Sequence, residues 1–130
     1  ILVMMTGVTP RTFSTAWFAR AARKMRIADE ELCKAVEQVR AGQADDLGGG
    51  VLKKRLDRNR ARSIIVAKGR RYWIYVYLFA KKDRDNITDA ELTGFRELAA
   101  LYDLKIDAEI DRELKAEILT EICDANEAQV

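Results

Sequence analysis

Two runs of β-branched and aromatic residues dominate the hydrophobic pattern, at residues 63–67 and 72–79. Such runs, bounded by glycine and charge, are typical of β-strands. Between them lies Gly69, which can adopt the positive φ of a tight turn, so the pattern predicts an antiparallel β-hairpin over residues 63–79. A third run, at residues 51–56, predicts a strand beside the hairpin.

The 72–79 run also predicts which side chains share a face of the sheet, because successive strand residues point to opposite faces. One face takes Tyr72, Ile74, Val76 and Leu78, and the other takes Trp73, Tyr75, Tyr77 and Phe79. No charge interrupts the run, which favours a central strand covered on both faces. We expect the aliphatic face to meet helices, and the aromatic face to form either a second core layer or a platform on which bases stack.

Apolar residues at helical spacing predict two helices ahead of the sheet, at residues 16–25 and 28–41. These helices should cover the aliphatic face of the hairpin. The expected buried stripes are Phe18, Ala22 and Met25 in the first helix, and Leu32, Val36 and Val39 in the second. Gly42 offers a C-terminal cap for the second helix.

Two further helices are predicted after the hairpin. Thr88 and Glu91 form a capping-box pattern that predicts the start of the first. Asp107 is the expected N-cap of the last helix, whose buried residues should be Ile110, Leu114 and Ile118.

The remaining segments give weaker signals. Residues 11–15 fit either a short edge strand or an extended lead-in, and residues 119–123 fit either a helix continuation or a short strand. Residues 43–50 are predicted to form a connecting loop. Their three glycines lack the GKS/T ending of a P-loop, which favours a sharp backbone turn over a phosphate cradle.

These patterns together predict an α+β fold, with N-terminal helices packed on a small antiparallel sheet and with C-terminal helices. The 130 residues are 48% hydrophobic, which suits one domain with a modest core. We expect residues 11–130 to form that domain and residues 1–10 to be a tail or residual vector sequence. Residues 1–5 are too short for the core of a signal peptide and lack its basic flank.

The formal net charge of +2 hides an uneven distribution of charge. Residues 53–84 contain twelve Lys or Arg and two acids, whereas residues 85–130 contain four bases and thirteen acids. A single basic run is usually a solvated face, but a small sheet would present these cations together. The pattern therefore favours a polyanionic partner.

Several function classes are disfavoured by what the sequence lacks. It contains no histidine, which removes imidazole metal ligands and the usual general base near neutral pH. Cys33 and Cys123 show neither metal spacing nor a disulfide framework, so we expect two small buried thiols in a reducing cytosol. No run is long and apolar enough to span a membrane. We therefore expect a cytoplasmic protein without a metal or other cofactor.

A basic surface around a stacking strand suits metal-free cleavage of RNA. In that reaction the 2′-hydroxyl attacks the neighbouring phosphate, a base takes its proton, and cations stabilise the developing charge. A lysine surrounded by cations has its ammonium form destabilised, and arginine binds phosphate oxygens in a bidentate manner. The alternative is that the same cations only bind RNA.

Three stretches of the sequence resemble a known family. They are Thr12-Phe13 with residues 16–19 (AWFA), residues 46–56 (DLGGGVLKKRL) and residues 78–87 (LFAKKDRDNI). From Arg11 to Cys123 the chain resembles the HigB-like branch of the RelE/ParE toxin superfamily. The resemblance implies a bacterial type II toxin held inactive by an antitoxin, here expected to be a small helix-turn-helix protein. RelE-type members cut mRNA on the ribosome without metal, whereas ParE-type members poison DNA gyrase, so the fold alone does not choose between them.

The resemblance also implies the site residues. The predicted catalytic set is Lys53, Lys54, Arg55, Ala61, Arg62, Lys81 and Arg84. The basic run and the aromatic face of the 72–79 strand indicate the predicted RNA-binding set, which is Arg58, Arg60, Lys68, Arg70, Arg71, Tyr75, Tyr77 and Lys82. Relatives commonly have histidine at the position of Ala61, so this chain would be either a naturally altered member or a disarmed one. Because Ala61 is predicted to lie in a loop, Ala61→His is expected to restore cleavage with little change in stability.

Three hypotheses follow from the sequence. The first is a ribosome-dependent mRNA endonuclease, the second is a toxin that acts on DNA gyrase without catalysis, and the third is a plain RNA-binding module.

Overall fold

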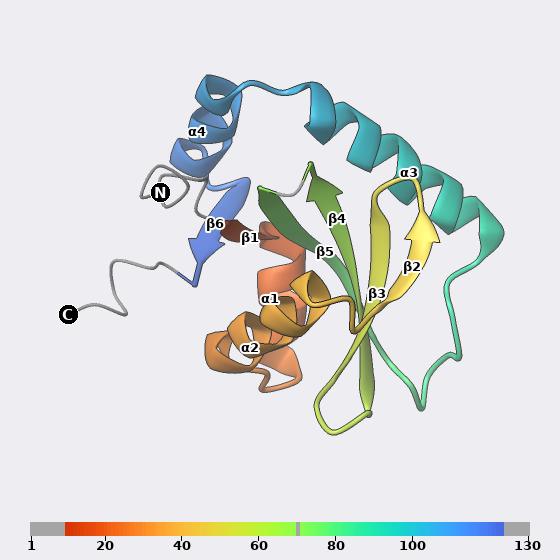
Figure 1. The fold of residues 1–130 in the computed structure, drawn as a ribbon. Coiled ribbons are helices and arrows are strands. Elements are labelled where there is room, and N and C mark those ends of the chain that lie inside the picture. Colours follow the sequence, from red (N-terminus) through yellow and green to blue (C-terminus); the bar gives the residue numbers. More distant parts are fainter. Residues whose placement is uncertain (1–9, 70, 124–130) are drawn as a thin grey trace, which may run out of the picture.

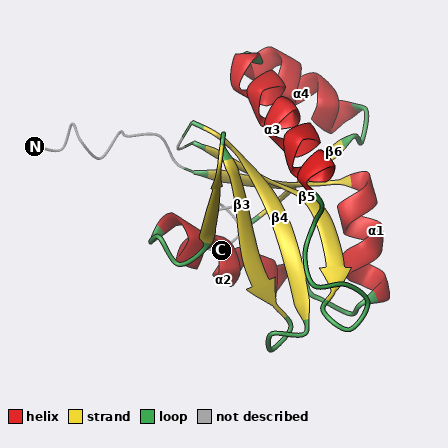
Figure 2. Ribbon diagram, turned by 90° about the vertical axis from the view of Figure 1, so that its right-hand side faces the viewer, coloured by secondary structure: helices red, strands yellow, loops and turns green. Residues whose placement is uncertain are grey.

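The computed structural model describes residues 10–69 and 71–123. In chain order its elements are β1 (Arg11–Thr15), α1 (Ala16–Lys24), α2 (Asp29–Arg40), β2 (Asp45–Gly48), β3 (Val51–Leu56), β4 (Ala61–Lys68), β5 (Tyr72–Ala80), α3 (Asp89–Leu104), α4 (Asp107–Lys115) and β6 (Leu119–Ile122). The strands form one sheet in the order β2-β3-β4-β5-β1-β6. Helices α1 and α2 lie on one face of this sheet, and α3 crosses the other (Figures 1 and 2). The predicted α+β class is confirmed.

The predicted hairpin is present as β4 and β5, which pair antiparallel, with β3 antiparallel to β4 on the other side. Gly69 has φ +60° in the connecting turn, as expected. The sheet is antiparallel apart from β1, which pairs parallel with β5.

The strict alternation predicted for β5 breaks in the middle of the strand. Ile64 lies opposite Tyr77, but Ile65 lies opposite Tyr75, so Val76 is an extra residue at this irregularity. An extra residue in a strand moves each side chain beyond it to the opposite face of the sheet from the one that strict alternation predicts. Val76 and Tyr77 consequently belong to the same hydrophobic cluster.

The expectation that the aliphatic face would meet the N-terminal helices is wrong. Ile74 and Val76 are buried against α3 and α4, in a cluster that includes Tyr102 and Ile110. Trp73, Tyr75 and, beyond the irregularity, Leu78 fill the layer under α1 and α2 instead, where the Phe18 and Tyr75 rings lie 4.9 Å apart. Both faces of β5 are apolar, and the pattern alone did not say which helix pair covers which face. The predicted covering of both faces is confirmed.

Three weakly signalled segments are resolved by strand pairing. β1 is neither the predicted edge strand nor an extended lead-in outside the sheet, because it is a strand between β5 and β6. β6 is a strand, antiparallel to β1 at one edge of the sheet. The predicted loop at residues 43–50 contains β2, which pairs with β3 at the other edge. Gly50 sits in a tight β2–β3 turn under α3, where an added Cβ would lie 3.2 Å from the Ala99 Cβ.

The helices largely match their sequence signals. Thr88 caps α3, and both hydrogen bonds of its capping box with Glu91 are present. Leu32, Val36 and Val39 are buried in α2, as predicted.

The start and end of α4 differ from the prediction. The N-cap of α4 is Ile106, one residue before the predicted Asp107, and the Glu109 carboxylate accepts a hydrogen bond from its backbone N–H. Ile110 is buried, but Ile118 is 51% exposed because the helix already ends at Lys115.

The expectation of two free thiols is wrong. Cys33 on α2 and Cys123, directly after β6, form a disulfide across a sequence separation of 90 residues. A pairing at that separation leaves no local spacing pattern to detect. Within the described ranges, no helix has the length and apolar character needed to cross a bilayer.

Candidate nucleic-acid interface

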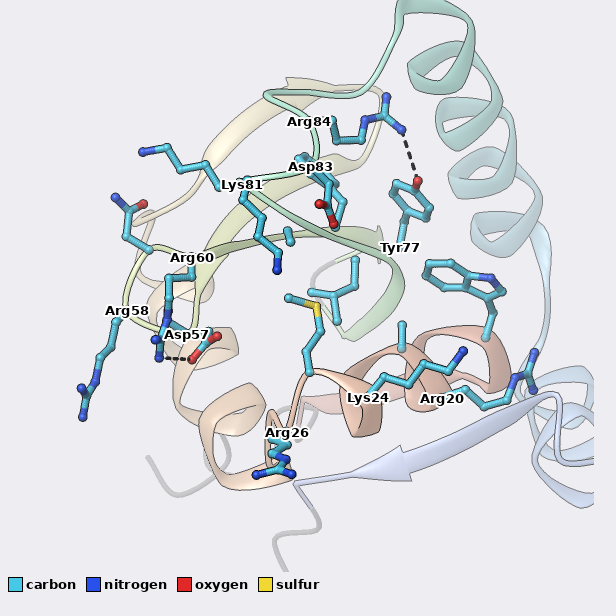
Figure 3. Close-up of a pocket in the computed structure, with 18 residues that line it drawn as sticks. Arg20, Lys24, Arg26, Asp57, Arg58, Arg60, Tyr77, Lys81, Asp83 and Arg84 are labelled. Atoms are coloured by element: carbon cyan, nitrogen blue, oxygen red, sulfur yellow. Dashed lines mark hydrogen bonds and ion pairs between the residues drawn. The ribbon is translucent and has the colours of Figure 1, made fainter.

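An open groove of about 1460 Å³ lies where four segments meet: α1, the β3–β4 turn, the end of β5 and the loop that follows it (Figure 3). Its position follows from the sheet topology. β1 pairs with β5 only from Tyr72 to Tyr75, and the chain then enters α1 at Ala16. The last residues of β5 are therefore flanked by a helix instead of a strand, and this leaves room for the groove.

The wall of the groove is aromatic on the α1 side. The indole of Trp17 stacks on the phenol ring of Tyr77, with centroids 5.0 Å apart and an interplanar angle of 22°. Tyr77 also packs against Phe95 of α3, at 5.7 Å. Trp17 nevertheless remains 45% exposed, which is unusual for tryptophan and leaves part of the indole available to a ligand.

Cations surround this wall. The charged residues that line the groove are Arg20, Lys24, Arg26, Arg58, Arg60, Lys81, Lys82 and Arg84, with two acids, Asp57 and Asp83. Eight bases against two acids give a strongly positive field in a concave surface, and such a surface attracts polyanions. Aromatic rings beside cations are the combination that binds single-stranded nucleic acid, through stacking and phosphate contacts.

The β3–β4 turn is held in place by hydrogen bonds within the turn and by one to α2. Asp57 and the two residues after it have positive φ, and the Asp57 N–H donates to the Glu31 carboxylate at 2.5 Å. Arg60 donates to the Asp57 carboxylate at 3.1 Å, and Arg62 donates to the Asn59 carbonyl at 3.0 Å. The Asp57 carboxylate is thus paired within the turn.

Arg84 ties the loop after β5 to the start of α3. Its guanidinium donates to both Glu91 carboxylate oxygens, at 2.5 and 3.1 Å, and to the Tyr77 hydroxyl at 3.2 Å. Hydrogen bonds from Arg84 and from the Thr88 backbone hold the pKa of Glu91 down at about 2. Arg84 thereby orients Tyr77 and fixes the loop that carries Lys81 and Asp83.

This network predicts an acid-sensitive contribution to stability. The folded-state pKa of Glu91, about 2, lies below its ordinary value of 4.5, so folding favours the ionised form. The contribution is fully present above about pH 4.5 and should be lost as the pH falls through the folded-state pKa of about 2. Urea unfolding of the wild-type chain and of Glu91→Gln at pH 7, 4 and 2.5 measures it. The stability difference between the two proteins should shrink toward low pH, and a constant difference would contradict this assignment.

Six residues of the predicted site do line the groove: Arg58, Arg60, Tyr77, Lys81, Lys82 and Arg84. The β3 cations Lys53, Lys54 and Arg55 do not line it. Lys53 lies 3.3 Å from the Asn86 side-chain oxygen, and Lys54 donates to the Gln43 carbonyl at 2.9 Å. The predicted catalytic set is therefore divided among the groove, β3 and the start of β4.

The prediction that Ala61 lies in a loop is wrong. Ala61 is the first residue of β4. Its methyl group is fully buried in the cluster that contains Phe18 and Ala22, so it borders no open surface. Arg62 is 9% exposed and donates to the carbonyls of Asn59 and Ala61. The environment of Arg62 fits a residue that stabilises the turn.

Tyr75 is a core residue, which contradicts its predicted role in RNA binding. It is fully buried, and its hydroxyl donates to the Leu32 carbonyl at 2.7 Å. Burial also raises its pKa.

Two more predicted RNA-binding residues lie at the opposite end of the hairpin from the groove. Lys68 donates to the Asp103 carbonyl at 3.1 Å, and Arg71 pairs with Asp107 at 3.5 Å. Arg70 lies outside the described residues. The basic run is thus not one continuous surface, because its members separate toward the two ends of the sheet.

The α1 side of the groove was not predicted from the sequence; it consists of Trp17, Arg20, Lys24 and Arg26. Trp17, Arg20 and Lys24 are spaced i, i+3 and i+7, which places them on one helical face. A tryptophan sharing the polar face of an amphipathic helix with two cations was the available signal. Among the described residues no cluster of three or more potential metal ligands from His, Cys, Asp and Glu occurs.

One family of known proteins matches most of the chain. The family model described as the RelE toxin of the RelE/RelB toxin-antitoxin system matches residues 10–122, which is nearly the whole described domain. Neither a curated protein nor a solved structure matches the chain. The family match covers all six strands and all four helices, together with every residue of the groove. The chain belongs to the RelE toxin family and is a toxin of a toxin-antitoxin system.

Proposed function

We propose that this toxin is a metal-independent mRNA endonuclease that acts on the ribosome, in the manner of the HigB-like branch. The observation that carries the proposal is the groove, in which eight cations surround the stacked Trp17–Tyr77 pair. RNA supplies both of the complementary groups, bases for the rings and phosphates for the cations.

The positions of the cations in the groove suggest which phosphates each of them contacts. Lys24 and Lys81 line the groove from opposite sides, Lys24 from α1 and Lys81 from the loop after β5 (Figure 3). A phosphate between them would receive charge from two directions, which stabilises the extra negative charge of a pentacoordinate phosphorus. Arginines at the rim, such as Arg20 and Arg58, can hold the flanking phosphates. Lys53, Lys54 and Arg55 on β3 would extend the contact surface toward the ribosome.

Membership of the RelE family implies a cognate antitoxin. We propose that this partner is a small helix-turn-helix protein, and that the toxin acts in the cytoplasm, where translating ribosomes are found. Co-expression with the product of the neighbouring small gene should abolish growth arrest.

Mapping transcript 5′ ends after induced expression tests the endonuclease. Cleavage should create new ends within translated frames and should stop when translation initiation is blocked. Growth arrest without new transcript ends, accompanied by loss of DNA supercoiling activity, would favour the gyrase-directed alternative. Binding of RNA without growth arrest would favour a plain RNA-binding module.

The salt dependence of RNA binding tests the groove itself. With about five phosphate contacts, the slope of log K against log salt should be roughly −3.5 to −4.5. Replacing Arg20 and Lys24 together by Ala should reduce the magnitude of the slope by about 1.4, since each single-strand contact contributes about 0.7. Fluorescence anisotropy with a labelled single-stranded RNA measures it.

The matched control is the double variant Lys34→Ala/Lys115→Ala. It removes the same charge from exposed positions on α2 and α4 that do not line the groove. Its slope should stay close to that of the wild-type chain. Equal slopes for the two double variants would show that only net charge matters and would contradict binding in the groove.

A further inference from the structure

We propose that the Asp83 carboxylate is the general base of the cleavage reaction and that the neighbouring Lys81 ammonium is its general acid. The inference rests on the proposed endonuclease function and names the proton acceptor and donor of that same groove. The sequence suggested two other candidates for the general base: a lysine of the basic run, or a histidine imidazole at position 61. Ala61 is buried in the core, so a group at that position would not reach the groove.

The groove offers few side chains that can accept a proton. Of its ten charged residues, eight are bases, and a lysine ammonium or an arginine guanidinium has donors but no acceptor. Only Asp57 and Asp83 carry carboxylates. Asp57 is paired with Arg60 at 3.1 Å inside the β3–β4 turn. The Asp83 carboxylate has no hydrogen-bond or ion-pair partner among the described residues, and in Figure 3 it points into the cavity on the same side as the Lys81 ammonium.

The backbone around Asp83 is held on both sides, although the loop is on the surface. The Lys81 N–H donates to the Arg60 carbonyl at 2.8 Å, and the Asp83 N–H donates to the Ala80 carbonyl at 3.0 Å. The next residue, Arg84, is anchored on Glu91 by two hydrogen bonds. The backbone that carries Asp83 is therefore fixed, and this places its exposed carboxylate at the lining of the groove, within reach of a bound substrate.

The reaction balances with these two groups and needs no further reactant. Asp83 takes the proton of the 2′-hydroxyl while the 2′-oxygen forms a bond to the adjacent phosphorus. The bond from phosphorus to the 5′-oxygen breaks, and this leaving oxygen takes a proton from the Lys81 ammonium. The products are a 2′,3′-cyclic phosphate and a 5′-hydroxyl, with no change of oxidation state. Proton exchange with water returns both side chains to their starting forms.

The first test compares Asp83→Asn with Asp85→Asn. Both substitutions remove one carboxylate from the same loop, but Asp85 does not line the groove. Single-turnover cleavage of mRNA on programmed ribosomes should be about 10²- to 10⁴-fold slower for Asp83→Asn and little changed for Asp85→Asn. Asp83→Glu, which keeps a carboxylate, should recover part of the rate. Binding to ribosomes that carry an mRNA with a 2′-deoxy residue at the cleavage position should not weaken in any variant.

The second test assigns the two roles separately. An mRNA with a 5′-bridging sulfur at the cleavage position has a leaving group that needs no proton. This substrate should restore the rate of Lys81→Ala but not that of Asp83→Asn. If Asp83→Asn cleaves normal mRNA as fast as the wild-type chain, or loses only binding, the assignment of the base is overturned. If the sulfur substrate fails to restore Lys81→Ala, the assignment of the acid is overturned. If the wild-type chain leaves ribosome-bound mRNA intact, the endonuclease proposal itself fails.

Discussion

Replacing Ala61 by histidine should destabilise the domain strongly and should not create an active enzyme. The Ala61 methyl group has no exposed surface and packs in the cluster that contains Phe18 and Ala22. An imidazole there must displace these neighbours, which typically costs about 1–3 kcal/mol. It also buries two ring nitrogens away from partners, at about 1–3 kcal/mol more. We therefore expect the free energy of unfolding to fall by about 2–6 kcal/mol.

Urea unfolding at neutral pH measures this effect, with Arg58→His as the matched control. Arg58 is exposed in the β3–β4 turn, three residues before Ala61, so the same new side chain should change stability by no more than about 0.5 kcal/mol. Equal stability of Ala61→His and the wild-type chain would mean that the imidazole escapes to solvent and that the start of β4 is looser than the packing implies. Cleavage measured on the folded fraction of Ala61→His should show no gain.

The local elements of the fold were predictable because each has a local cause. The capping box at Thr88 and Glu91 needs only four consecutive residues, and the hairpin needs two β-rich runs and Gly69. Each of these is complete within one stretch of sequence. The structure confirms them.

Relations between distant segments were not predictable in the same way. Which helix pair covers which face of β5 depends on where β1 inserts into the sheet and on the irregularity opposite Ile64 and Ile65. Neither leaves a mark on the hydrophobic pattern of β5, since both faces of that strand are apolar. The central position of β1 was also not predictable, because this five-residue segment shows only weak alternation.

Only the part of the candidate site that is local in the sequence could be predicted. The residues around the end of β5, such as Lys81 and Arg84, lie next to one another in the sequence, so their shared location follows from connectivity. Charge density alone could not separate them from Lys68 and Arg71, which the hairpin carries to the opposite end of the sheet. Trp17 comes to the groove from a helix 60 residues away from Tyr77, and only the packing of α1 on β5 brings the two rings together.

Loss of the Cys33–Cys123 disulfide should cost a large part of the stability of this domain. The bond links residues separated by 90 positions, so it removes a large loop from the freedom of the unfolded chain. Chain-entropy arguments assign about 4.5 kcal/mol to a loop of this length, and removal of native disulfides typically costs about 2–5 kcal/mol. The disulfide also ties α2 to the end of the edge strand β6, which otherwise pairs only with β1. We expect β6 to open before the rest of the sheet once the bond is reduced.

Unfolding in urea should be compared for the wild-type chain, each single Cys→Ala variant and the double variant Cys33→Ala/Cys123→Ala, all without reductant. The two single variants and the double variant should lose the same stability within about 0.5 kcal/mol, because each removes the same bond and sites in one bond are not additive. Adding reductant should destabilise the wild-type chain to that common level and leave the double variant unchanged. Titration of the native wild-type protein should find no reactive thiol, whereas each single variant should show one. Two reactive thiols in the native protein, or a wild-type chain no more stable than the double variant, would contradict the disulfide and return both cysteines to the role of small buried side chains between α2 and β6.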